Sequence, residues 1–325
     1  MNNINNKFAI GCLVQWYEID IIEEYVDSLK QSLDQINNAE NVMIHFTLTT
    51  NQDLEKIDKS QIDMKEIETR FKSMMSDKNW QFEITSELYT IADYRRWFND
   101  CFCEKADVLI WGETDALLPK QLFIILDNLH EGVKDKTPKY TTFFGTCKMW
   151  DESWKILEHP EFTDKPFYSE PEDFIPDKHW WSNRYTMTIK EMNKFNDKVQ
   201  ELDVRILNQH KFNGCGLVIS SEVIKAGVNI PRSVFFVHED TSFMMMIQKV
   251  LGMIPQYVIK NILLVHNRNH PNKRMYVKNE RIDGTMNEKR RSNDWYVKAN
   301  HMSEQNCYNF FNPNFKSFTW EDVWK

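Results

Sequence analysis

The sequence predicts an α/β protein built on a mostly parallel, mixed sheet that is flanked by helices. Short apolar runs alternate with longer amphipathic segments through the first half of the chain, which is the pattern of βα repeats. Several runs, such as Ala106 to Trp111, are apolar without alternation, as expected of strands covered on both faces. Strands of such repeats pair in parallel, so their carboxyl ends meet at one edge of the sheet.

The individual elements follow from hydrophobic periodicity, taken in chain order. Apolar runs of strand length predict strands at 8–14, 42–49, 80–84, 106–111 and 214–220. Apolar residues at helical spacing predict helices at 19–33, 64–75, 91–103 and 190–207. Pro119 suits the first turn of a helix over 120–129, so residues 112–118 are expected to form a loop above the preceding strand. A later apolar run, 262–265, ends at His266 and predicts another strand.

One large domain with an added tail is expected. Residues 150–184 are rich in proline, acidic and aromatic residues and lack periodicity, which is typical of a lid or binding element. We therefore predict a main domain at 1–275 that carries this irregular insertion. Residues 276–325 are predicted to form a basic and aromatic extension that packs on the main domain.

Composition narrows the class of protein. The chain has 325 residues, enough to bury a large core, and its net charge of −8 argues against general nucleic-acid binding. Basic residues nevertheless exceed acidic ones between Lys260 and Asn300, a stretch that could face phosphate. No apolar run is long enough to span a membrane and no secretory leader is recognisable, so a cytoplasmic protein is expected. The six cysteines are scattered without a Cys-x-x-Cys pair, which predicts reduced core residues rather than zinc ligands.

Two acidic side chains follow the apolar run that ends at Trp111. Glu113 and Asp115 are one residue apart in a short loop, so their carboxylates should lie close together. Mg²⁺ and Mn²⁺ prefer oxygen ligands, and bound phosphates commonly complete their shell. The pair is therefore a candidate anchor for a metal ion and a diphosphate. The alternative is that Asp115 caps the next helix while Glu113 is simply solvated.

Two further groups of polar residues lie downstream. Glu239 and Asp240 follow an apolar run and begin a helical pattern, where acids also interact well with the helix dipole. His266 follows the strand at 262–265 and could be a metal ligand, although a lone histidine there is more often hydrogen-bonded structure. Three basic residues beyond it could neutralise a diphosphate or form a solvated face: Arg268, Lys273 and Arg274.

The order of these motifs resembles that of GT-A glycosyltransferases, in particular the inverting enzymes that use nucleoside-diphosphate sugars. The segment Trp111-Gly112-Glu113-Thr114-Asp115 resembles the family's Asp-x-Asp loop, with Glu113 departing from it at the first position. The resemblance implies a GT-A-type, Rossmann-like sheet. It also implies that Glu113, Thr114 and Asp115 bind the donor, and that Asp115, Glu113 and His266 bind Mn²⁺ or Mg²⁺. His238-Glu239-Asp240 resembles the family's x-Glu-Asp motif, so the implied catalytic residues are Asp240, as general base, and Glu239 beside it.

The resemblance also implies contacts with the nucleotide. Arg95 and Arg96 lie where the family has an arginine-containing helix, and Gln15 and Trp16 follow the strand whose end contacts the nucleobase. Asn213 to Leu217 resembles the small-residue segment on the acceptor side, and the insertion at 150–184 would be an acceptor lid. Arg268, Lys273 and Arg274 would screen the diphosphate.

The implied activity is metal-dependent, inverting transfer of a sugar from a nucleoside-diphosphate sugar, with a UDP-sugar the expected donor, to a saccharide hydroxyl. A DNA glycosyltransferase that acts on a hydroxymethylated pyrimidine is the main alternative, because of the basic stretch after Lys260. A nucleotidyltransferase would also need paired carboxylates and metal, but no glycine-rich phosphate loop follows the first strand. A non-catalytic, glycan-binding relative would tolerate the loss of Asp115 or Asp240, and both are present.

Overall fold

The computed structural model describes residues 2–51, 63–76, 80–148, 188–267 and 293–325. Its described strands form one nine-stranded sheet in the order β3-β2-β1-β4-β8-β6-β9-β5, with β7 paired to β9. The strands are β1 (Phe8–Gln15), β2 (Val42–Thr49), β3 (Gln81–Thr85), β4 (Val108–Trp111), β5 (Ala116–Leu117), β6 (Thr141–Lys148), β7 (Val204–Ile206), β8 (Val218–Ser220) and β9 (Gln256–His266).

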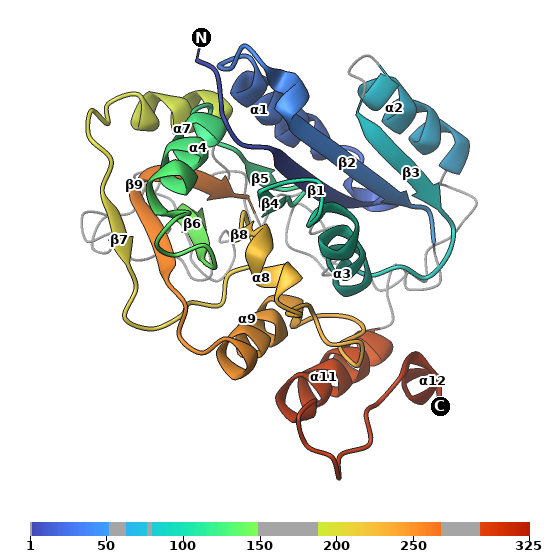
Figure 1. Cartoon of the computed structure of the whole chain (residues 1–325). Helices are drawn as coiled ribbons and strands as arrows, with labels where there is room; N and C mark the ends of the chain where they lie inside the picture. The colour runs from blue at the N-terminus through green and yellow to red at the C-terminus, as the bar shows by residue number, and fades with distance from the viewer. Residues whose placement is uncertain (1, 52–62, 77–79, 149–187, 268–292) are drawn as a thin grey trace, which may run out of the picture.

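Helices connect these strands and cover both faces of the sheet (Figure 1). The α-helices are α1 (Ile22–Leu33), α2 (Met64–Ser76), α3 (Ile91–Phe102), α4 (Leu122–Val133), α7 (Ile189–Asn196), α8 (Ser221–Lys225), α9 (Glu239–Val250), α11 (Asn293–Asn309) and α12 (Trp320–Trp324). Two short 3₁₀ helices, η1 (Trp16–Glu18) and η2 (Ala39–Asn41), precede α1 and β2.

The central strand β1 shows why the sheet has a core on each side. Its alternate residues Phe8 and Ile10 belong to one apolar cluster, which includes residues of α1 and α4. Ala9 and Leu13 belong to a second cluster, which includes residues of α3 and α9. Because both faces are buried, the strand is apolar without alternation.

The predicted α/β class is confirmed. Strands β3, β2, β1 and β4 pair in parallel, and β9 pairs in parallel with β6. Strand β8 runs antiparallel between β4 and β6, so the sheet is mixed and most of its strands share one direction. The carboxyl ends of β4 and β9 therefore lie at the same edge.

Three predicted elements differ from the structure. The expected loop at 112–118 contains β5, because Ala116 and Leu117 pair with the end of β9. The helix expected at 190–207 ends at Asn196, and β7 follows because it finds a partner in β9. The strand expected at 214–220 begins only at Val218, because Gly216 adopts φ +65°. The predicted insertion at 150–184 lies outside the described residues.

The last described segment packs onto the domain. Trp295 and Ala299 of α11 and Val323 of α12 form an apolar cluster with Phe235, which precedes α9. Figure 1 shows α11 beside α9, with α12 beyond it at the C-terminus. This cluster places the end of the chain next to the Glu239-Asp240 segment.

Candidate active site

The loop after β4 is held in a close turn against β1 and β9. Gly112 donates its N–H to the Gly11 carbonyl at 2.7 Å, and any Cβ at Gly112 would collide with the Tyr25 hydroxyl. Ala116 N–H donates to the Glu113 carbonyl at 3.0 Å, which closes the turn. Directly after it, Ala116 pairs with His266 across the β5–β9 ladder. This register brings His266 to the two carboxylates.

Glu113, Asp115 and His266 form the centre of the site. The His266 Nε2 atom lies 2.9 Å from Glu113 Oε2 and 3.3 Å from Asp115 Oδ1. The Asp115 side chain is fully buried, and that of Glu113 is 21% exposed. The sequence predicted this proximity, whereas the metal-binding role of the three residues stays a prediction.

The charges within the cluster shift the pKa values of Glu113 and His266 more than burial does. Burial raises the pKa of Glu113, but His266 and Arg95 together hold that pKa well below its ordinary value. Burial lowers the pKa of His266, but Cys215, Asp115 and Glu113 hold it well above the ordinary value. The cluster therefore stabilises positive charge at the His266 position strongly.

Cys215 is a member of this cluster that the sequence did not predict. Ligand atoms of Glu113, Cys215 and His266 all lie within 4.8 Å of one another, and Cys215 is 2% exposed. The segment Asn213 to Leu217 reaches the site because Trp111 N–H donates to the Leu217 carbonyl at 2.9 Å. The scattered cysteines gave no ligand spacing; the flanking glycines were the only signal at this position.

Arg95 joins the Glu113 loop to the Glu239 motif. Its guanidinium donates to Glu113 Oε1 at 2.7 Å and to Glu239 Oε1 at 2.5 Å. It also donates to the Gly214 carbonyl at 3.2 Å and lies 4.7 Å from the centre of the Trp111 ring. The Arg95 side chain is 2% exposed. Its described contacts are thus internal, and the nucleotide contact that the sequence predicted stays a prediction.

Glu239 and Asp240 begin helix α9. The preceding residue, His238, has φ +69°, a left-handed conformation that costs a non-glycine residue about 1 kcal/mol. The tail braces this turn, because His238 Nε2 bonds Asn300 Oδ1 at 3.0 Å and Ser303 Oγ donates to the Val237 carbonyl at 2.7 Å.

The two acids of this motif lie in different surroundings. Glu239 is 8% exposed, and burial raises its pKa to about 7 against the opposing charge of Arg95. Asp240 is half-buried, and one of its carboxylate oxygens accepts the Thr241 N–H at 2.7 Å. A Cβ on Gly214 would lie 3.3 Å from the Asp240 Cβ and 2.6 Å from Arg95 Nη1, so the glycine allows close approach. Asp240 is therefore the more accessible of the two carboxylates.

The other residues predicted to bind the donor are buried or make contacts within the protein. Thr114 and Trp16 are buried, and Gln15 ends β1 with its N–H bonded to Glu18 Oε2 at 2.9 Å. Arg96 donates to the carbonyls of Ile230, Pro231 and Val234, which anchors the segment before the Glu239 motif. Their roles toward a nucleotide stay predictions.

Most of the basic stretch between Lys260 and Asn300 lies outside the residues that the structure describes. Arg268, Lys273 and Arg274 lie outside the described residues. Lys260, at its start, is 6% exposed within β9 and does not belong to a basic surface.

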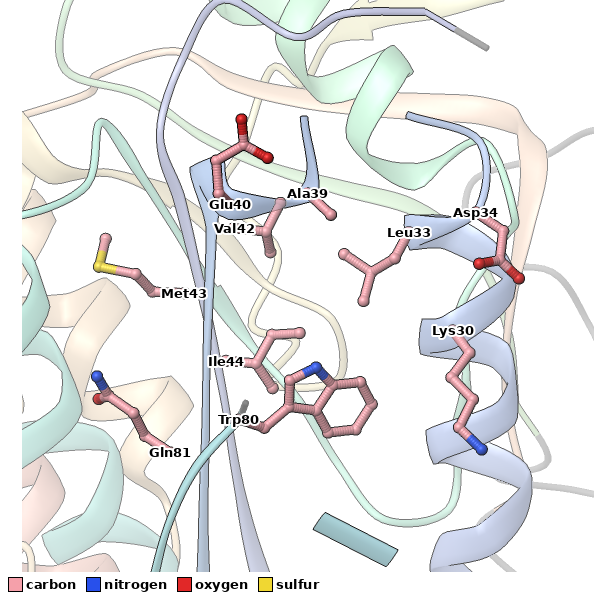
Figure 2. Close-up of a pocket in the computed structure, with 10 residues that line it drawn as sticks. All are labelled: Lys30, Leu33, Asp34, Ala39, Glu40, Val42, Met43, Ile44, Trp80 and Gln81. Carbon is pink, nitrogen blue, oxygen red and sulfur yellow. The ribbon is translucent and has the colours of Figure 1, made fainter. Parts of the chain in front are cut away.

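A cavity of about 570 Å³ lies elsewhere in the molecule (Figure 2). Its lining includes Val42, Met43 and Ile44, which begin β2, and Gln81, which begins β3. These are the amino ends of parallel strands, whereas Glu113 follows the carboxyl end of β4. The cavity therefore lies at the opposite edge of the sheet from the acidic cluster, and its charged lining residues are Lys30, Asp34 and Glu40.

The side chains at the carboxyl edge fit a divalent cation. Two carboxylates and an imidazole converge from β9 and the loop before β5, and a thiol approaches from the loop before β8. Carboxylates suit Mg²⁺ and Mn²⁺, and imidazole is a common ligand for the later divalent metals. Metal binding at Nε2 requires His266 to give up its proton, so affinity should rise with pH.

Comparisons with known proteins identify structural similarity only. No family model and no curated protein matches the chain. Among solved structures, it is similar to a mannosyltransferase from Pyrobaculum calidifontis in complex with GDP-Man and Mn²⁺, with 10% identity over 82% of this chain and 58% of that one (TM-score 0.44). It is similar to GalNAc-T7 with UDP, GalNAc and Mn²⁺, with 9% identity over 82% and 44% of the two chains (TM-score 0.45).

A third similar structure is glucosyl-3-phosphoglycerate synthase from Mycobacterium tuberculosis, in complex with Mn²⁺, UDP and glucosyl-3-phosphoglycerate. It shares 10% identity over 83% of this chain and 75% of that one (TM-score 0.44). The chain thus spans less than two thirds of two of these three proteins. In the part of the chain that is described, no helix is both long and apolar enough to cross a membrane. At such TM-scores the similarity establishes no activity for this chain.

Proposed function

We propose that this chain is a metal-dependent, inverting glycosyltransferase that moves a sugar from a nucleoside-diphosphate sugar to an acceptor hydroxyl. One observation carries the proposal: a cluster of two carboxylates and an imidazole and a separate, accessible carboxylate meet at the carboxyl edge of one sheet. His266 Nε2 lies 2.9 Å and 3.3 Å from two carboxylate oxygens in the cluster. Arg95 links this cluster to the Glu239-Asp240 motif through two ion pairs.

The cluster is the donor side of the proposed reaction. Asp115, Glu113 and His266 would hold Mn²⁺ or Mg²⁺, which supplies neutralising charge for a diphosphate leaving group. Glu113 is shared between Arg95 and His266, so its carboxylate is oriented from two sides. Thr114 separates the two acids in the sequence, so Glu113 and Asp115 lie one residue apart in the loop. Side chains that are already held in place lose less conformational entropy when they bind a cation.

Asp240 belongs to the acceptor side of the proposed reaction. Inverting transfer needs one group that removes the proton from the attacking hydroxyl, and a half-exposed carboxylate at a helix start can take it. Glu239 is held in the Arg95 ion pair, so we assign Asp240 as the carboxylate that would act on the acceptor hydroxyl. Arg95 and the left-handed turn at His238 hold the Asp240 backbone in place.

Binding and turnover test the two sides separately. Thermal unfolding is measured with UDP, GDP, CDP and dTDP and their sugars, with and without Mn²⁺. A nucleotide present at 100 times its Kd should raise Tm by about 4 °C for a chain of this size, only when Mn²⁺ is present. Asp240→Asn should lower transfer by about 10²- to 10⁴-fold and leave this shift unchanged. Asp115→Asn should remove the shift itself.

Asp27→Asn is the matched control, because Asp27 is an exposed acid on α1 that pairs with Lys30 at 3.3 Å. It should change neither binding nor transfer. Transfer retained by Asp240→Asn would overturn the assignment of the base. Absence of any metal-dependent nucleotide shift in the unsubstituted chain would overturn the proposed donor and favour a non-catalytic relative. No described residue favours the DNA acceptor, since the basic residues that suggested it lie mostly outside the described ranges.

A further inference from the structure

Cys215 lies at the cation cluster and not in a purely apolar pocket. Its Sγ, a Glu113 carboxylate oxygen and a His266 ring nitrogen all fall within 4.8 Å of one another. In a tetrahedral site, metal–sulfur and metal–nitrogen bonds of about 2.3 and 2.0 Å put ligand atoms about 3.5 Å apart. The three atoms are therefore close to bonding positions around one ion, and small side-chain movements complete the geometry.

The backbone directs the thiol into the site. Gly216 has φ +65°, and a Cβ there would collide with Leu264 of β9. Its N–H donates to the Trp111 carbonyl at 3.1 Å, which fixes Cys215 beside the loop that carries Glu113. Cys215 also packs against apolar residues, as buried cysteines commonly do. Packing alone does not account for a thiol that shares one small volume with an imidazole and a carboxylate.

We propose that Cys215 is a ligand of the divalent cation and makes the site selective for Mn²⁺, Co²⁺ or Zn²⁺ over Mg²⁺. The inference rests on the metal site of the proposed function. The donor set becomes carboxylate oxygen, imidazole nitrogen and thiolate sulfur. Mg²⁺ demands an octahedral shell of oxygen ligands, whereas thiolates favour softer ions. On binding, a metal–sulfur bond forms and the thiol proton passes to the buffer.

Cobalt spectroscopy tests the ligand directly and without turnover. Co²⁺ is titrated into the chelator-treated, full-length chain, and the near-ultraviolet sulfur-to-cobalt charge-transfer band is recorded. The unsubstituted chain should show the band. Cys215→Ser should lose it and bind Co²⁺ at least about tenfold more weakly, with Mg²⁺ affinity changed less than about threefold. Cys101→Ser, on α3 away from the cluster, is the matched control and should keep the band.

Two outcomes separate this inference from the proposed function. Co²⁺ binding without a sulfur band, together with metal-dependent nucleotide binding, overturns the Cys215 ligand and leaves the function standing. A sulfur band without nucleotide binding supports the ligand and overturns the function. If Cys215→Ser fails to fold, X-ray absorption of Zn²⁺ bound to the unsubstituted chain decides. A sulfur neighbour at about 2.3 Å supports the ligand, and a shell of oxygen and nitrogen alone overturns it.

Discussion

Replacement of Arg95 by methionine would leave two buried carboxylates without their shared cation. Glu113 and Glu239 both pair with this guanidinium, whose side chain is 2% exposed. Removal of one partner from a buried ion pair costs about 3–5 kcal/mol, because the remaining charge is desolvated and unpaired. Loss of the bond to the Gly214 carbonyl adds about 1 kcal/mol, which the apolar volume of methionine partly offsets. We expect the free energy of unfolding to fall by about 4 kcal/mol.

Urea unfolding at pH 7.5 with a chelator present measures this loss, since a bound cation would otherwise pair with Glu113. Arg70→Met is the matched control: Arg70 also pairs with an acid, Asp20, at 2.8 Å, but its side chain is 38% exposed. That substitution should cost no more than about 1 kcal/mol. Glu113 keeps His266 as a partner, so Glu239 is the carboxylate that Arg95→Met leaves without its cation, and adding Glu239→Gln should restore about 2 kcal/mol. Equal losses for Arg95→Met and Arg70→Met, or a further loss in the double variant, would refute the reasoning.

Two further predictions concern stability. Burial lowers the pKa of His45 to about 4, so the folded state holds the ring neutral, and stability present above pH 6.5 is lost as the pH falls toward 4. His45→Asn keeps a hydrogen-bond donor toward Tyr94. Between pH 7 and 5, the free energy of unfolding of the unsubstituted chain should fall by about 2 kcal/mol more than that of this variant. Identical pH dependence of urea unfolding in the two proteins would contradict this. Gly216→Ala should cost about 3 kcal/mol through its positive φ and its contact with Leu264, and Gly227→Ala, with φ +89° and open space, about 1 kcal/mol. Gly132 in α4 has neither a positive φ nor a close neighbour, so Gly132→Ala should be neutral or stabilising. Equal Tm values for the three glycine variants would reject the conformational argument.

Local signals predicted the sheet and the centre of the site. The continuous apolar run of β1 follows from burial on both faces, and this pattern is visible without any knowledge of partners. Glu113 and Asp115 were expected to lie together in the loop after a strand, and the resemblance to GT-A glycosyltransferases implied that His266 joins them.

Long-range pairing explains what could not be predicted. The predicted helix ran over β7 because Val204–Ile206 is too short for its alternation to be distinguished from a helical pattern, and the strand depends on pairing with β9. The two acidic partners of Arg95 are 18 and 144 residues away, so its internal role is invisible in the local sequence. Cys215 reaches the cluster only through the left-handed Gly216 and the contact with Trp111.

The contacts of Asn300 with His238 and of Ser303 with Val237 make the position of the proposed general base depend on a distant part of the chain. The donor cluster is held by the sheet and by Arg95 of α3, whereas the turn before Asp240 is also held by Asn300 and Ser303, each more than sixty residues downstream of its partner. A change in these tail residues would therefore slow turnover at an unchanged affinity for the donor. The tail would then affect the rate of the reaction through the position of Asp240.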